Sequence, residues 1–172
     1  LMGQFTDGRE LLDKSIRLRP EGLAVLAAKT HWLAQYGHLS EAVRHGIETY
    51  EAHPAFTSNI AALARVYTML GLTERAQEMV TALDELGASS HHSRLAHWDF
   101  LLGSGNFDAF INEANTDFTR LDVQPGGELN FEQARIVRLY GLALLLQRRD
   151  EAAAEHLLWS AGGAEGIERI TY

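Results

Sequence analysis

The chain contains no cysteine among its 172 residues. Disulfide bonds and thiolate chemistry are therefore excluded, and a chain without disulfides is typical of the cytoplasm, which is the location we expect. Basic residues are also scarce, because 15 lysines and arginines stand against 23 aspartates and glutamates, for a net charge of −8. Since contacts to phosphate dominate nucleic-acid affinity, this deficit argues against nucleic acid, and equally against an anionic membrane surface, as the main partner.

Long apolar runs are missing as well. The longest, YGLALLLQ at residues 140–147, is too short to cross a bilayer, so we expect no membrane span. The opening LMGQFTDGRE has neither the basic nor the apolar region of a signal peptide. Hydrophobic residues nevertheless make up 46% of the chain and charged residues 22%, which is the balance of a globular protein with a core.

A repeat of 34 residues dominates what the sequence does contain. Gly3, Gly37, Gly71 and Gly105 are spaced at this interval, and similar text follows each: GQFTDGRELL, GHLSEAVRHG, GLTERAQEMV and GNFDAFINEA. This period predicts helix pairs, because a glycine with positive φ can end one helix just before the next begins. Acidic or hydroxyl residues then follow and are expected to cap the second helix: Thr6-Asp7, Ser40-Glu41, Thr73-Glu74 and Asp108.

Two prolines mark the other end of the helix pairs at the same interval. Pro20 and Pro54 are 34 residues apart, and each is expected to end a second helix because proline cannot continue one. A longer loop, TRLDVQPGGELN, interrupts the period once before the last helix pair. The predicted helices span residues 6–18, 23–35, 39–52, 56–69, 73–86, 91–103, 107–119, 129–147 and 151–160.

This pattern resembles the tetratricopeptide repeat (TPR) family over nearly the whole chain, up to about Ser160; the alternative is a chance amphipathic helical bundle. The resemblance implies an all-α, right-handed solenoid of helical hairpins with about four and a half repeats. We expect a half repeat at 1–22, repeats at 23–56, 57–90, 91–127 and 128–160, and a cap or tail at 161–172. The residues that carry the resemblance are Pro54, Leu63-Ala64, Tyr67, Gly71 and Ala76.

Two features depart from the family pattern. Trp98 and Phe110 stand where neighbouring repeats carry small residues, so we expect the helix pair of repeat 91–127 to be pushed apart or shifted in register. The first repeat is only a second helix, and a half repeat leaves an apolar face uncovered. We therefore expect the chain to be a fragment of a longer one, with further helices or another domain before residue 1.

In TPR proteins the first helix of each pair lines a concave face, and this face binds an extended peptide or a helix of a partner. The resemblance therefore implies a protein or peptide partner here, with small residues on the groove floor, at Ala24, Ala27, Ala34 and Ala61. The polar anchors would be His31, Arg65 and Asp99, although Arg65 and Asp99 alternatively pair only with each other. Some TPR proteins bind the C-terminal carboxylate of a partner with Lys, Arg and Asn on successive first helices. This carboxylate clamp is not visible in the present sequence. The expected contacts are His31, Gln35, Ser58, Arg65, Met69, His92, Leu95, Asp99 and Arg138.

We expect no enzymatic activity, no cofactor and no metal site. His92 and His97 in SSHHSRLAH lack the i,i+4 spacing of a chelating pair, and no glycine elbow supports a hydrolase. A second hypothesis is an oligomerisation or intramolecular regulatory module attached to an upstream catalytic or DNA-binding domain. Its contacts would come from the solenoid ends, Trp159 and the loop 119–130. A histidine-dependent enzyme is a third hypothesis, and single-strand RNA binding, the fourth, disagrees with both the period and the charge.

Overall fold

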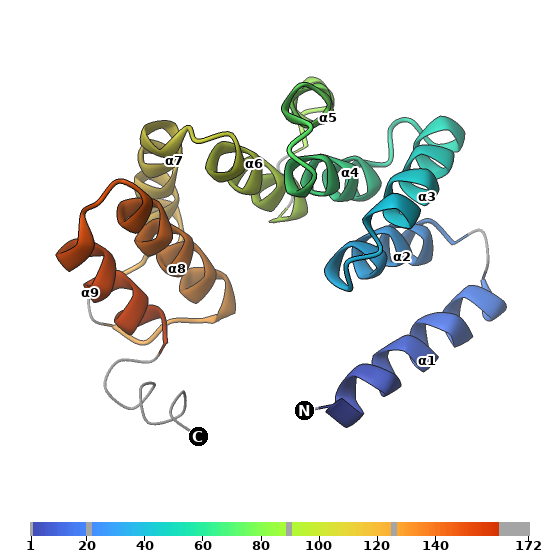
Figure 1. Ribbon diagram of the computed structural model, residues 1–172, viewed down its shortest axis with the longest axis horizontal. Coiled ribbons are helices and arrows are strands. Elements are labelled where there is room, and N and C mark those ends of the chain that lie inside the picture. The colour runs from blue at the N-terminus through green and yellow to red at the C-terminus, as the bar shows by residue number, and fades with distance from the viewer. Residues whose placement is uncertain (1, 20–21, 89–90, 125–126, 162–172) are drawn as a thin grey trace. The chain divides into compact units, whose positions relative to one another are not determined.

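The structure is a computed structural model that describes residues 2–19, 22–88, 91–124 and 127–161. Every regular element in this part of the chain is an α-helix, which confirms the all-α prediction (Figure 1). Helices α2, α3 and α6 have the bounds expected from the sequence. The elements are α1 (Met2–Leu18), α2 (Leu23–Gln35), α3 (Leu39–Ala52), α4 (Thr57–Met69), α5 (Thr73–Glu85), α6 (His91–Gly103), α7 (Phe107–Arg120), α8 (Phe131–Leu146) and α9 (Asp150–Ser160).

The turns between paired helices repeat the same backbone geometry. Gly37, Gly71 and Gly105 have φ values of 79°, 69° and 79°, in the left-handed region that glycine enters without steric cost. The N–H of Gly37 donates to the carbonyl of Ala34 and the N–H of His38 to that of Leu33, at 3.1 and 2.9 Å. This is the Schellman pattern, and it recurs around Gly71. The 34-residue glycine period therefore has a structural cause.

Two expectations about helix starts are wrong. Helix α1 begins at Met2, so Gly3 lies inside a helix rather than in a turn. The expected hydroxyl and acidic caps are also not used, because the residue after each turn glycine is itself the N-cap and makes no side-chain cap bond. Acidic residues instead occupy the first turn, where their negative charge interacts favourably with the positive end of the helix dipole. These residues are Glu41, Glu74 and Asp108.

The chain forms two compact units, residues 1–104 and 105–172, where the sequence predicted one solenoid through residue 160. The boundary falls inside the predicted repeat 91–127, between Trp98 and Phe110, the two bulky residues that depart from the repeat pattern. Both side chains are buried. In the first unit, α2 packs on α3, α4 packs on α5, and the first helices α2, α4 and α6 are successive neighbours. The individual repeat boundaries remain predictions.

In the second unit, α8 packs against both α7 and α9. The side chain of Asn130 accepts from the backbone N–H of Gln133, and the Gln133 side chain accepts in return, which forms a capping box at the start of α8. Gln133 Nε2 also donates to the carbonyl of Leu121 at 2.8 Å, and Trp159 Nε1 donates to the carbonyl of Gly127 at 2.8 Å. The described part of the loop before α8 is therefore bonded to its own unit, and Trp159 is one of the side chains that hold it.

The core of the first unit depends on a close approach of α3 and α4. Gly46 on α3 is buried, and a Cβ atom at this position would lie 2.6 Å from Cδ2 and 2.9 Å from Cγ of Leu63. Leu63 is itself 1% exposed and has no open space into which to move. A residue without a side chain is therefore required where the two helices meet.

Buried polar groups connect these two helices with α2. Thr30 Oγ1 on α2 lies 3.0 Å from His45 Nδ1 on α3 and donates to Asn59 Oδ1 on α4 at 3.3 Å. Asn59 Nδ2 donates to the carbonyl of Gly46 at 2.9 Å. Thr30 and Asn59 are fully buried, so these bonds satisfy groups that would otherwise be costly to remove from water. Burial lowers the pKa of His45 from its usual 6.5, and Lys29 lowers it further, against an opposing effect of Glu48.

We expect Gly46→Ala to destabilise the protein by about 1–3 kcal/mol, because the new methyl group overpacks against Leu63. Helix propensity alone predicts that the variant is more stable than the native protein, since alanine is favoured over glycine by about 1 kcal/mol inside a helix. Urea denaturation followed by circular dichroism measures the difference. Glu51→Ala, at an exposed position of the same helix, is the matched control and is expected to change stability by less than about 0.5 kcal/mol. A Gly46→Ala protein as stable as the native one would contradict this packing.

The lowered pKa of His45 also predicts a pH dependence. The folded state binds the proton less readily than the unfolded state, so the contribution of His45 to stability is present above pH 6.5 and is lost as the pH falls below it. We expect the urea midpoint to fall between about pH 7.5 and about pH 5.5, and His45→Gln to reduce this fall. Equal pH dependence in the native protein and in the variant would show that His45 does not contribute to it.

Candidate partner-binding groove

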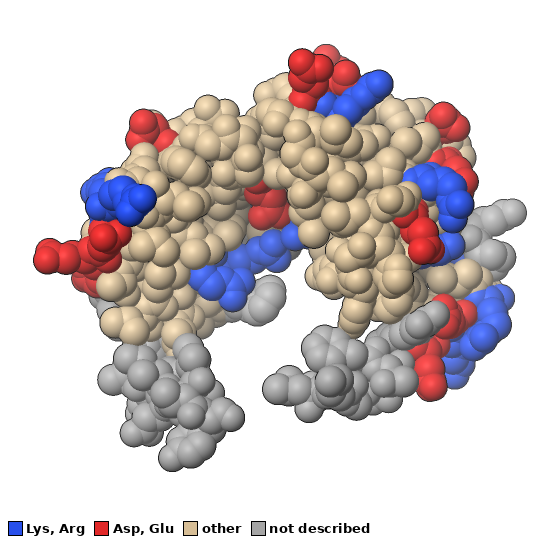
Figure 2. Space-filling model, viewed as in Figure 1, with Lys and Arg blue, Asp and Glu red and all other residues tan. Residues whose placement is uncertain are grey.

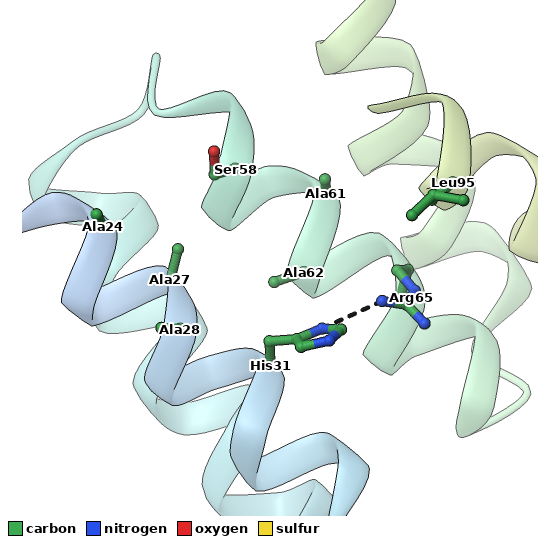
Figure 3. Close-up of a pocket in the computed structure, with 9 residues that line it drawn as sticks. All are labelled: Ala24, Ala27, Ala28, His31, Ser58, Ala61, Ala62, Arg65 and Leu95. Carbon is green, nitrogen blue, oxygen red and sulfur yellow. Dashed lines mark hydrogen bonds between the residues drawn. The ribbon is translucent and has the colours of Figure 1, made fainter. Parts of the chain in front are cut away.

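A cavity of about 300 Å³ lies between the first helices α2 and α4, with α6 contributing at one side. Its walls are small because residues on successive turns of both helices are mainly alanine. Figure 3 shows the alanines of α2 and the residues of α4 facing the same space, with Leu95 of α6 beyond them. The lining residues are Ala24, Ala27, Ala28, His31, Ser58, Ala61, Ala62, Arg65 and Leu95.

A row of polar side chains crosses the three first helices at the edge of this cavity. Gln35 Nε2 lies 2.8 Å from His31 Nε2, and Arg65 Nη1 lies 3.1 Å from His31 Nδ1. Arg65 Nε donates to Asp99 Oδ2 and forms an ion pair with it. The side chains of Arg65 and Asp99 are each 22% exposed. We call these four residues the polar row. Three of them, His31, Arg65 and Asp99, are spaced 34 positions apart, so the repeat itself aligns them.

The hydrogen bond from Arg65 determines the tautomer of the His31 ring. A guanidinium group has only donors, so His31 Nδ1 must accept and carries no proton. The proton of the neutral ring is then on Nε2, which donates to Gln35. The Gln35 amide therefore presents its oxygen to this proton, an orientation assigned from the hydrogen-bond network. Arg65 thus determines which ring nitrogen of His31 acts as the acceptor.

The predicted contacts are distributed unevenly around this site. His31, Ser58, Arg65 and Leu95 line the cavity, and Gln35 and Asp99 complete the polar row. The alternative that Arg65 and Asp99 pair with each other is realised, but the pair also belongs to this row. The other contacts lie elsewhere: Met69 is 56% exposed and outside the lining, Arg138 is on α8 in the second unit, and the side chain of His92 is outside the described part.

The floor differs in part from the sequence prediction. Ala24, Ala27 and Ala61 line the cavity as expected, but Ala34 does not. Ala34 is 5% exposed and packs in the core between paired helices, in a cluster that includes Leu33, Ala42 and Val66. Sequence reasoning missed Ala28, although its position four residues from Ala24 and three from His31 on α2 could have revealed it.

The charged surface is mixed rather than of one sign. Figure 2 shows basic and acidic side chains next to each other in several places, and most of the visible face is uncharged. Among the described residues, no group of three or more His, Asp or Glu side chains could hold a metal ion. The described helices are also too short or too polar to cross a membrane. The site is therefore an apolar cavity with an arginine at its edge, Arg65, that is paired with Asp99.

We expect nitrogen-15 NMR of the histidine rings to find His31 with Nδ1 unprotonated and Nε2 protonated at neutral pH, because Nδ1 accepts from Arg65. The Arg65→Met variant retains an apolar stem and removes the donor. It is expected to release the ring into a mixture of both neutral forms. A proton on Nδ1 in the native protein would contradict the bond between Arg65 and His31.

Comparisons with known proteins support this description at the level of the fold. No family model matches the sequence, and no curated protein matches it significantly. A solved structure, a tetratricopeptide repeat protein from Parabacteroides merdae ATCC 43184, is similar with a TM-score of 0.59 and 14% sequence identity. The match covers 99% of this chain and 76% of that one. The predicted TPR-like helical repeat fold is thus confirmed.

Proposed function

We propose that the first unit binds a segment of a partner protein along α2, α4 and α6. TPR-like folds generally mediate protein–protein interactions and are typically not enzymes. The observation that carries the proposal is the apolar cavity with the polar row at its edge, since a small apolar pocket with a few convergent polar groups is the usual form of a binding site. The cysteine-free sequence supports a cytoplasmic location for this interaction.

The residues have different roles in this proposal. Leu95 contacts the bound segment inside the cavity, Ser58 contacts it at the edge, and Arg65 orients it there. His31 and Asp99 position Arg65 from its two sides, and Gln35 in turn orients His31. Met69, His92 and Arg138 remain predicted contacts that a longer partner segment would reach.

A second candidate function is self-association through the second unit. It is favoured by apolar side chains on α8 that face solvent: Leu142, Leu145 and Leu146 are 39%, 44% and 59% exposed. They lie three and four residues apart and so share one face of the helix. Trp159, which the sequence suggested for this role, is instead partly buried and bonded to Gly127.

The proposed groove can be tested by photocrosslinking in the native host. We expect p-benzoylphenylalanine at Ser58, at the edge of the cavity, to crosslink to a partner protein, and the same group at Arg44 on the outer face of α3 not to do so. Arg65→Glu should abolish the crosslink from Ser58, because it places two carboxylates side by side with Asp99. The captured partner is then identified by mass spectrometry and its binding is repeated with purified proteins.

Two results would contradict the groove assignment. One is a partner that crosslinks equally from Ser58 and from Arg44. The other is a partner that remains bound to the folded Arg65→Glu protein. A product with the mass of two copies of this chain, obtained from a group at Leu145 but not at Ser58, would instead favour self-association.

A further inference from the structure

The cavity between α2 and α4 limits what a bound segment can insert, and this inference rests on the proposed function because it concerns the same site. Its volume of about 300 Å³ is at the lower end of the range for small-molecule sites, about 300–1,000 Å³. This space admits one bulky side chain with its adjoining main chain, whereas a helix about 10–12 Å in diameter is too wide to enter it.

The walls select an apolar side chain. Alanine methyl groups from α2 and α4 form most of the lining, and Leu95 closes the side formed by α6 (Figure 3). Ala27, Ala61 and Ala62 are 8%, 2% and 6% exposed, so the floor is firmly packed from behind. A charged or amide side chain placed against these methyl groups would lose its bonds to water and gain no replacement.

Arg65 supplies a directed donor at the edge of the cavity. Within the described part of the chain, its Nε donates to Asp99 and its Nη1 to His31, which leaves Nη2 to donate to a ligand. These two bonds also hold the guanidinium plane in a fixed direction. An acceptor on the bound segment therefore meets a donor that is already oriented and loses little further freedom on binding.

The charge of this donor is already balanced. Asp99 forms an ion pair with Arg65, and His31 accepts from Arg65 as a neutral ring. A carboxylate at Nη2 would approach the Asp99 carboxylate across the same guanidinium group, and like charges this close are costly. A main-chain carbonyl needs only the hydrogen bond and does not meet this repulsion.

We propose that the cavity receives one bulky aliphatic side chain from the interior of an extended partner segment, whose adjacent main-chain carbonyl accepts from Arg65. The site discriminates against a carboxylate at that position, whether a chain terminus or an acidic side chain. Asp99 is the residue that determines this preference, because it neutralises Arg65 without contacting the bound side chain.

Three capped amino acids test this proposal by titration of the full chain in nitrogen-15 correlation spectra. N-acetyl-leucinamide is expected to shift the amide resonances of Ala27, Ala61 and Arg65. N-acetyl-leucine differs from it only by a carboxylate and is expected to bind about tenfold more weakly. N-acetyl-alaninamide has the carbonyl but leaves most of the cavity empty, so it should bind more weakly than the leucine amide.

Matched variants separate the contributions of charge and space. Asp99→Asn leaves the Arg65 charge uncompensated and is expected to reverse the preference toward N-acetyl-leucine. Ala28→Leu adds bulk to the lining at an exposed position and is expected to abolish binding of both leucine probes, whereas Ala154→Leu, at an exposed position on α9, should change nothing. If Asp99→Asn does not fold, Arg65→Met takes its place and should remove the difference between the two leucine probes.

Each outcome decides the proposal. Stronger binding of the amide, reversed by Asp99→Asn, supports it. Equal or stronger binding of N-acetyl-leucine to the native protein overturns it, and so does the absence of shifts with any probe up to its solubility limit. Neither failure is a failure of the proposed function, because the crosslink from Ser58 and its loss in Arg65→Glu are measured with the whole partner.

Discussion

The left-handed glycine turn is the constraint on which the rest of the first unit depends. At Gly37 and Gly71 the backbone leaves one helix and enters the next within a few residues, so successive helices must pair. Pairing at a constant interval makes the first helices α2, α4 and α6 neighbours. Residues 34 positions apart then meet in space, which is why His31, Arg65 and Asp99 form one connected row although they are far apart in the chain.

The positions of small side chains determine where neighbouring helices touch and where a cavity remains between them. Between α3 and α4, Gly46 lets the helices touch, and the core there is fully packed. Between α2 and α4, alanines on facing turns leave a cavity instead. The polar groups are divided in the same way: Thr30 and Asn59 bond to each other in the interior, whereas Arg65 at the edge is paired with Asp99. Packing and the proposed recognition thus use adjacent faces of the same helices.

Much of this could be predicted from the sequence, because the glycine period determines the helix ends and aligns equivalent positions. The row of His31, Arg65 and Asp99 follows from that alignment alone. Other features could not be predicted from this alignment. Which face of α2 Ala34 occupies depends on the rotation of the helix against two neighbours, and Ala34 was assigned to the wrong face. The division after Ser104 is not visible in the 34-residue period, which continues through Gly105.

The most direct test of the central claim, that the repeat brings residues 34 apart into one connected row, is a double-mutant cycle on Arg65 and Asp99. The unfolding free energies of Arg65→Met, Asp99→Leu and the double variant are compared with that of the native protein by urea denaturation. A half-buried ion pair is expected to give a coupling energy of about 1 kcal/mol. Effects that add to within about 0.3 kcal/mol would show that the two side chains do not interact, and would contradict the account.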